Sequence, residues 1–198
     1  MLPNSISEAA IHKAYSSFNN FFEGTDMQNE LEKLDTLIKA ACSKKPCTNK
    51  LLHRHFQFVN SLVELCKAAF IIYRAKHKFV AAWWPLPEGD VDVDIKQLQQ
   101  YVNPSFNGSP WTCLPRHLSW LQYHNPYKAI KKLVQTMPLS KWEKALQLLL
   151  AQAIRPGGLH CAMSLTKLLK VKKRLAQLIE ACHLIIVRTH NSVSALAK

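Results

Sequence analysis

Apolar residues recur at steps of three and four along most of this chain, the spacing at which side chains share one face of an α-helix. The longest such run is predicted to extend from Thr48 to Phe79. Its apolar stripe consists of Leu51, Leu52, Phe56, Val59, Leu62, Val63, Cys66, Ala69, Phe70 and Tyr73. A short alternation, "DVDVDI" at residues 90–95, is typical of a turn or a brief strand. The pattern predicts an all-α protein with this long helix at the centre of a helical bundle.

Capping residues, prolines and glycines indicate where the other helices begin and end. Ser5 and Glu8 predict a capping box for the first helix, and Gly24 ends it. Ser140 and Glu143 predict a second capping box. We expect about seven to eight helices in all, a brief one at 95–102 among them. Besides the long helix, the main ones are predicted at 5–24, 25–43, 114–124, 125–138, 140–155 and 164–188.

Charge is distributed unevenly along the chain. The 198 residues carry a net charge of +13. Residues 1–94 hold eleven Lys and Arg against eleven Asp and Glu, and are therefore neutral. Residues 95–198 hold fifteen Lys and Arg against two acids, Glu143 and Glu180, so they carry the whole excess. Such an asymmetry predicts a polyanionic partner, which is a nucleic acid, an anionic membrane or an acidic protein.

The charge boundary coincides with the least regular part of the sequence. Residues 80–117 contain five prolines and two glycines, which break helices and favour loops. We therefore predict a neutral helical N-terminal half with the long central helix (1–84), an irregular Pro-rich connector (85–112) and a basic helical C-terminal half (113–198). These halves form either separate domains or a single compact one.

The basic helices show cations on the face opposite their apolar seam. An ordinary solvated face mixes signs, because ion pairs at i,i+4 stabilise a helix and like charges destabilise it. Here the acids are missing. Moreover, Lys128, Lys141 and Lys167 fall in first turns, where the helix dipole favours an anion. We therefore interpret these cations as a binding surface rather than a solvated face. The predicted nucleic-acid-binding residues are Lys128, Lys131, Lys132, Lys141, Lys167, Lys170, Lys173 and Arg174.

The residue types indicate what kind of contact this surface makes. Lysine acts as a point charge and does not read base edges in a bidentate manner, so we expect phosphate-backbone contacts with weak sequence preference. Aromatic residues are interleaved with the charge and either stack on unpaired bases or belong to the core. The candidates for stacking are Trp111, Trp120 and Tyr123, with Tyr127 and Trp142 nearby.

No catalytic or cofactor-binding signature is present in the sequence. Cys42-x4-Cys47-x5-His53-x-His55 gathers zinc-ligand residue types, but the spacing does not match known zinc motifs. His53 and His55 lie about 200° apart on a helix, so they cannot face one metal. Residues 95–198 also have too few carboxylates for a two-metal site. We expect no metal, no cofactor and no enzymatic activity, the alternative being an active site that the fold assembles from distant residues.

These observations favour a non-enzymatic nucleic-acid-binding protein. The alternative is a helical interaction or regulatory protein whose basic half docks on an acidic protein partner or an anionic membrane surface. The N-terminal half then supplies a scaffold, a contact with a partner, or a homo-oligomer interface. Glu64, Lys67 and Arg74 interrupt the most apolar stretch, and the N-terminus lacks the pattern of a signal peptide. We therefore expect no membrane span and a cytoplasmic location, or a nuclear one in a eukaryote.

Overall fold

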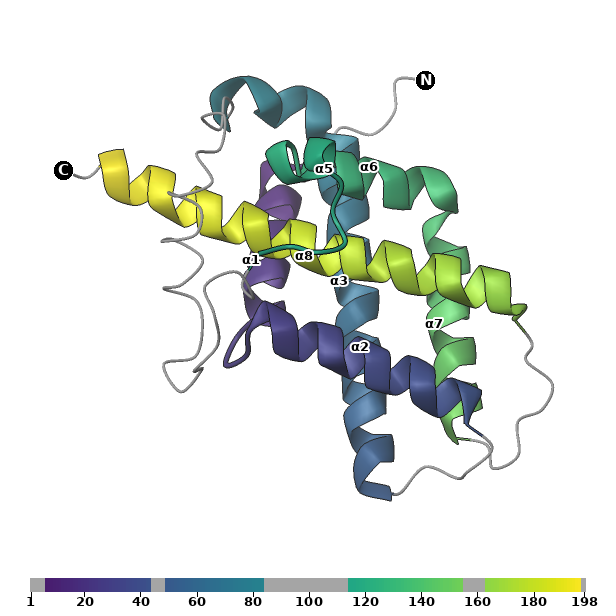
Figure 1. The fold of residues 1–198 in the computed structure, drawn as a ribbon. Coiled ribbons are helices and arrows are strands. Elements are labelled where there is room, and N and C mark those ends of the chain that lie inside the picture. Colours follow the sequence, from purple (N-terminus) through teal and green to yellow (C-terminus); the bar gives the residue numbers. More distant parts are fainter. Residues whose placement is uncertain (1–5, 44–48, 84–113, 155–162, 197–198) are drawn as a thin grey trace.

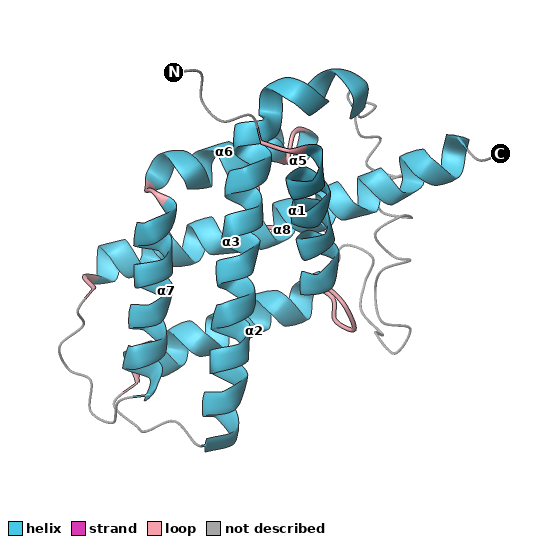
Figure 2. Cartoon of the chain, turned by 180° about the vertical axis from the view of Figure 1, so that it is seen from behind, coloured by secondary structure: helices cyan, strands magenta, loops and turns pink. Residues whose placement is uncertain are grey.

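The computed structural model describes residues 6–43, 49–83, 114–154 and 163–196, with side chains over 6–43, 51–75, 114–154 and 163–189. These ranges form seven helices and no strand, which confirms the predicted all-α helical bundle (Figures 1 and 2). The predicted connector 85–112, with its brief helix, lies outside the described residues. The helices are α1 (Glu8–Phe21), α2 (Met27–Cys42), α3 (Asn49–Trp83), α5 (Trp120–His124), α6 (Tyr127–Thr136), α7 (Leu139–Ile154) and α8 (Leu165–Leu196).

Both predicted capping boxes are wrong. At α1 the N-cap is Ser7, whose side chain accepts a hydrogen bond from the N–H of Ala10 at 3.3 Å. Ser140 lies inside α7, which begins one residue earlier, and the N–H of Lys141 donates to the carbonyl of Pro138 at 3.0 Å. α1 ends at Phe21, before the predicted stop at Gly24, which lies in the following turn with a φ of +70°, a conformation that other residues rarely adopt. The chain turns there from α1 into α2.

The helices form two crossing layers. In both views α3 runs beside α7, while α8 runs beside α2 and crosses them (Figures 1 and 2). α1 also packs against α3, and α6 packs against α8. One hydrophobic core takes residues from both halves of the chain, including Phe18, Leu34, Leu62, Leu146 and Leu175, all nearly inaccessible to solvent. The neutral helices are therefore the surface against which the basic helices bury their apolar faces.

Residues 175–188 of α8 are buried on every side, although they include the polar side chains of Gln177, Glu180, His183 and Arg188. The segment 114–124, which leads into and forms α5, lies across this part of α8 (Figure 1). Leu114 and Leu118 pack there against Leu184 and Val187 on α8. The sequence pattern predicts an apolar seam along one side of this helix, with the cations of residues 167–174 on the other side, and it does not indicate that residues 175–188 are buried all round.

Glu180 holds the covering segment through its backbone. Its carboxylate accepts hydrogen bonds from the N–H groups of Arg116 (2.8 Å), His117 (2.8 Å to Oε2) and Leu118 (3.0 Å). Gln177 adds a bond from its Nε2 to the carbonyl of His117 at 2.9 Å. Successive N–H groups that converge in this way form a concave site for an anion. Glu180, one of the two acids of the basic half, is therefore fully buried, and its carboxylate is hydrogen-bonded within the protein.

We predict that Glu180 and His183 give the stability opposite dependences on pH. Burial raises the pKa of Glu180 to about 7, against the backbone N–H donors that lower it, so the native state holds a proton that the unfolded chain releases above about pH 4.5. This contribution to stability falls as pH rises from about 4.5 to 7. Burial lowers the pKa of His183 to about 4, so its contribution rises as pH rises from about 4 to 6.5.

Between about pH 4.5 and 6.5 the contributions of Glu180 and His183 to the pH dependence of stability have opposite signs and largely cancel. Removing the carboxyl group of Glu180 should therefore leave the contribution of His183 visible. In the Glu180→Gln variant, the free energy of unfolding is expected to increase more steeply with pH over this range than in the wild type. Urea unfolding at three pH values within the range measures both slopes. Identical slopes in the two proteins would contradict the assignment of the raised pKa to Glu180.

The apolar part of α3 has the length and composition of a membrane-spanning segment over Leu51–Ala75. Half of the most apolar 18-residue stretch of this segment is buried within the fold, where α3 packs against α1, α6 and α7. A core helix of a soluble protein has the same length and composition, so these properties alone are weak evidence for a membrane span.

Candidate nucleic-acid interface

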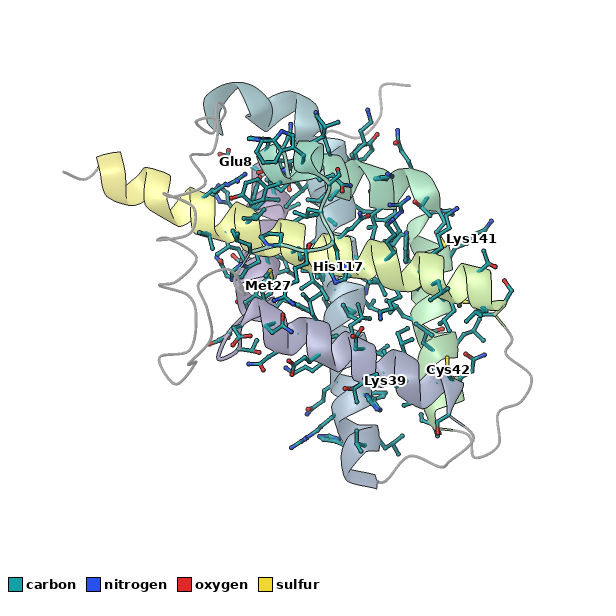
Figure 3. The ribbon with its side chains drawn as sticks, in the orientation of Figure 1. Glu8, Met27, Lys39, Cys42, His117 and Lys141 are labelled. Carbon is teal, nitrogen blue, oxygen red and sulfur yellow. The ribbon has the colours of Figure 1, made fainter. Side chains whose placement is uncertain are left out.

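The seven predicted lysines are all exposed and lie on α6, α7 and α8. We call these residues the basic surface: Lys128, Lys131, Lys132, Lys141, Lys167, Lys170 and Lys173. α6 and α8 pack against each other, and Lys141 stands at the start of α7, directly after α6 (Figure 3). The fold thus places on adjoining helices lysines that lie up to 45 positions apart in the sequence.

The first turns of α6, α7 and α8 contain no acidic residue. As the sequence predicts, each contains a lysine instead: Lys128, Lys141 and Lys167. The N–H groups of a first turn lack partners within their helix and carry a partial positive charge. A lysine beside them adds to a local field that favours an anion such as phosphate.

The two acids of the described C-terminal helices are engaged with other segments of the protein. In the described part of the chain after residue 113, the acids are Glu143 and Glu180. Glu180 is buried under the segment 114–124. Glu143 is two-thirds buried, and its Oε1 lies 3.9 Å from the Nζ of Lys67 on α3. The tertiary structure therefore buries Glu180 and places the one-third exposed Glu143 beside Lys67 of α3, which the sequence could not show.

Two of the cations at the start of α8 have partners within the protein. Lys172 forms an ion pair with Asp35 of α2, with Nζ 2.8 Å from Oδ1. Arg174, one of the predicted binding residues, is half-buried and donates from Nη1 to Oε1 of Gln177 at 2.7 Å. These two side chains lie about 200° apart around α8. Lys170 and Lys173 lie between them on the exposed face.

This difference between neighbours leads to a prediction about Lys172 and Lys173. Lys173→Gln is expected to reduce the slope of log affinity against log salt by about 0.7 to 0.9, the value of one phosphate contact. Lys172→Gln should leave the number of phosphate contacts unchanged, because its ammonium already pairs with Asp35. Both variants lose one charge, so the comparison separates contact from net charge. Equal slopes for the two variants would contradict the prediction, because the number of phosphate contacts would then not depend on which of these lysines is free. Salt titrations of fluorescence polarisation with a labelled oligonucleotide measure these slopes.

The aromatic candidates differ in exposure. Trp142 is fully buried, with its Nε1 donating to the carbonyl of Leu133 at 3.3 Å. Tyr127 is partly buried, and its hydroxyl lies 2.8 Å from that of Tyr15. Tyr123 is only 9% exposed, whereas Trp120 is 65% exposed. Trp111 lies outside the described residues. Among the aromatic candidates that the structure describes, Trp120 is thus the one whose ring is open to a ligand.

The structure also shows exposed apolar side chains beside the lysines, which the sequence reasoning missed. Leu165 and Leu169 lie one turn apart on α8 and are 66% and 54% exposed. Both fall outside the apolar seam that packs on the core, and this was the signal available in the sequence. They make the exposed face at the start of α8 a mixture of cations and leucines.

Of the residues considered for zinc, the structure describes Cys42, His53 and His55, and these are not grouped so as to hold a metal ion. Cys42 is exposed at the end of α2, and Cys47 lies outside the described residues. His53 is exposed and lies 2.9 Å from the side-chain nitrogen of Gln57, whereas His55 is buried. The two histidines therefore occupy different sides of α3, as their spacing predicts. Within the described ranges, no three His, Cys, Asp or Glu side chains are grouped so as to hold a metal ion.

A polar cavity of about 700 Å³ lies between α1, α2 and the first part of α3. Its lining includes Asn20, Glu23, Asn29 and His55. The side chains carry both signs of charge, with Glu32 and Arg54 among them. No arrangement of a nucleophile with a base is apparent in this lining, and the cavity is built from the neutral half of the chain.

No protein-family model, curated protein or solved structure matches this chain.

Proposed function

We propose that this protein binds nucleic acid without catalysing a reaction, contacting the phosphate backbone through the basic surface on α6, α7 and α8. The observation that carries this proposal is the exposure of seven lysines on adjoining helices. The two acids of the same described region are buried or two-thirds buried. Because lysine contacts are made to phosphates rather than base edges, the affinity should depend weakly on sequence.

Fluorescence polarisation of the full chain with labelled DNA and RNA, single-stranded and duplex, tests the proposal at 50 and 200 mM salt. Each phosphate contact releases counterions, so six or seven contacts predict an affinity that falls about a thousandfold between these salt concentrations. Oligonucleotides of unrelated sequence should bind with similar affinity. Absence of binding to every strand at 50 mM salt would reject the function.

A second candidate function is docking on an acidic protein, and Leu165 and Leu169 favour it. A helix that presents both cations and exposed leucines resembles the basic amphipathic helices that bind protein partners or membrane surfaces. Leu165→Ser with Leu169→Ser distinguishes the candidates. Nucleic-acid binding should be unaffected by the double variant if the lysines alone make the contacts. If nucleic acid does not bind, the affinity of the same double variant for an acidic protein partner shows whether Leu165 and Leu169 contact that partner.

A further inference from the structure

Trp120 is the outermost member of a column of side chains that begins in the core. The buried Arg188 of α8 donates from Nη1 to the carbonyl of Tyr123 at 2.8 Å. Its guanidinium carbon also lies 5.1 Å from the centroid of the Tyr123 ring. The rings of Tyr123 and Trp120 are nearly parallel, with 17° between their planes and 6.2 Å between their centroids. The ring of His124 is edge-on to that of Trp120, with 4.1 Å between their centroids.

These contacts hold the indole in place while leaving much of it in water. A tryptophan that is 65% exposed gives up much of the stabilisation that burial of so large an apolar side chain provides. Yet the ring is supported by two aromatic neighbours, and one of them is fixed by a buried arginine. A side chain ordered before binding loses little entropy when a ligand covers it. This is the arrangement expected of a rigid platform for a flat ligand.

α5, which carries the column, adjoins the end of α6 at which Lys128 lies. Two residues, Asn125 and Pro126, connect α5 to α6, and Lys128 lies in the first turn of α6. α5 contacts both α6 and α8. A nucleic-acid strand whose phosphates follow the lysines of α6 therefore reaches α5 at the end of that row. Base stacking on an aromatic ring combined with a cationic track is how proteins bind single strands without reading their sequence.

We propose that Trp120 is a stacking platform for an unpaired base, so that the preferred ligand of this protein is single-stranded nucleic acid. This inference rests on the proposed nucleic-acid binding and adds the strandedness of the ligand. In a duplex the faces of the bases are covered by their neighbours, so a duplex offers the lysines its phosphates but offers Trp120 no open face.

The test compares Trp120→Ala, Trp120→Phe and Leu121→Ala, with single-stranded and duplex oligonucleotides of the same sequence. Leu121 is the matched control, because it is the next residue, is apolar and is 63% exposed. Loss of one stacked base is expected to weaken single-strand binding by roughly five- to a hundredfold in Trp120→Ala. Trp120→Phe should keep most of the affinity, and Leu121→Ala should bind as the wild type does. Duplex binding should be the same in all four proteins.

Equal affinity of Trp120→Ala and wild type for single strands would overturn the inference, as would an equal loss on duplex. A loss in Leu121→Ala as large as that in Trp120→Ala would also overturn it, since an aliphatic contact is then responsible. In each of these cases, binding that still depends on the lysines keeps the proposed function intact. Absence of wild-type binding to any strand rejects both. Thermal unfolding of each variant shows that the fold is retained. If Trp120→Ala is destabilised, Trp120→Leu provides the test, because it keeps a large apolar side chain but removes the aromatic face.

Discussion

Glu180→Ala is expected to lower the free energy of unfolding by about 3 kcal/mol, because three backbone N–H groups at a part-buried site lose their acceptor. Above about pH 7 native Glu180 is ionised, and hydrogen bonds to a carboxylate contribute more than those between neutral groups. The same change should release the segment 114–124 from α8. Chemical unfolding measures the global effect, and hydrogen exchange at the amides of Arg116, His117 and Leu118 measures the local one.

Glu180→Gln is the matched control for this change, because it keeps the shape of the side chain and one acceptor oxygen. Its amide nitrogen faces N–H donors, so we expect a loss of stability between that of the wild type and that of the alanine variant. Exchange at residues 116–118 should follow the same order. If the alanine variant matched the wild type in stability and exchange, the carboxylate would not be what holds the segment to the helix.

Replacing Lys128, Lys131, Lys170 and Lys173 together with Gln is expected to weaken nucleic-acid binding about a hundredfold or more near physiological salt. The physical reason is the loss of four phosphate contacts, each of which releases counterions. All four side chains are exposed, so the stability of the fold should change little. Fluorescence polarisation over a range of salt concentrations measures the affinity and the salt slope together.

A second variant removes the same amount of charge from the neutral half. Its positions are the exposed residues Lys13, Lys39, Arg54 and Arg74, each changed to Gln. Both variants lower the net charge from +13 to +9 by the loss of four cations. We expect the second to bind with nearly wild-type affinity and salt slope, since only the long-range field is reduced. A similar loss in both variants would mean that net charge, and no defined surface, attracts the nucleic acid.

The starts of helices show the limit of local reasoning in this chain. Periodicity predicts α1 and α7 correctly, because the apolar residues that form their buried stripes are close in sequence. The capping residues were wrong, because several residues near each start can serve as a cap. Ser7 caps α1 in place of Ser5, and the chain at α7 enters the helix before Ser140. The choice among such neighbours depends on how the whole helix packs, not on the local sequence.

For the candidate site too, the sequence predicts some features and not others. Its lysines could be predicted, because a cation on the side opposite an apolar seam faces water wherever the helix packs. The environment of each cation could not. Lys172 and Lys173 are adjacent and identical, yet one pairs with Asp35 on a distant helix. Nor could the sequence distinguish Trp120 from Tyr123, since the ring that remains exposed is decided by how α5 lies on α8.

Local sequence patterns are enough to predict a bundle of helices with positive charge on the outside of the C-terminal ones. Both properties follow from residues within one or two turns of each other. Packing between distant segments is what buries residues 175–188 of α8 on all sides, with Glu180 accepting hydrogen bonds from amides 62 to 64 residues earlier in the chain. An isolated acid in a basic helix looks solvated until the covering segment is in place. Burial is a property of contacts between distant segments, and those contacts exist only once the chain has folded.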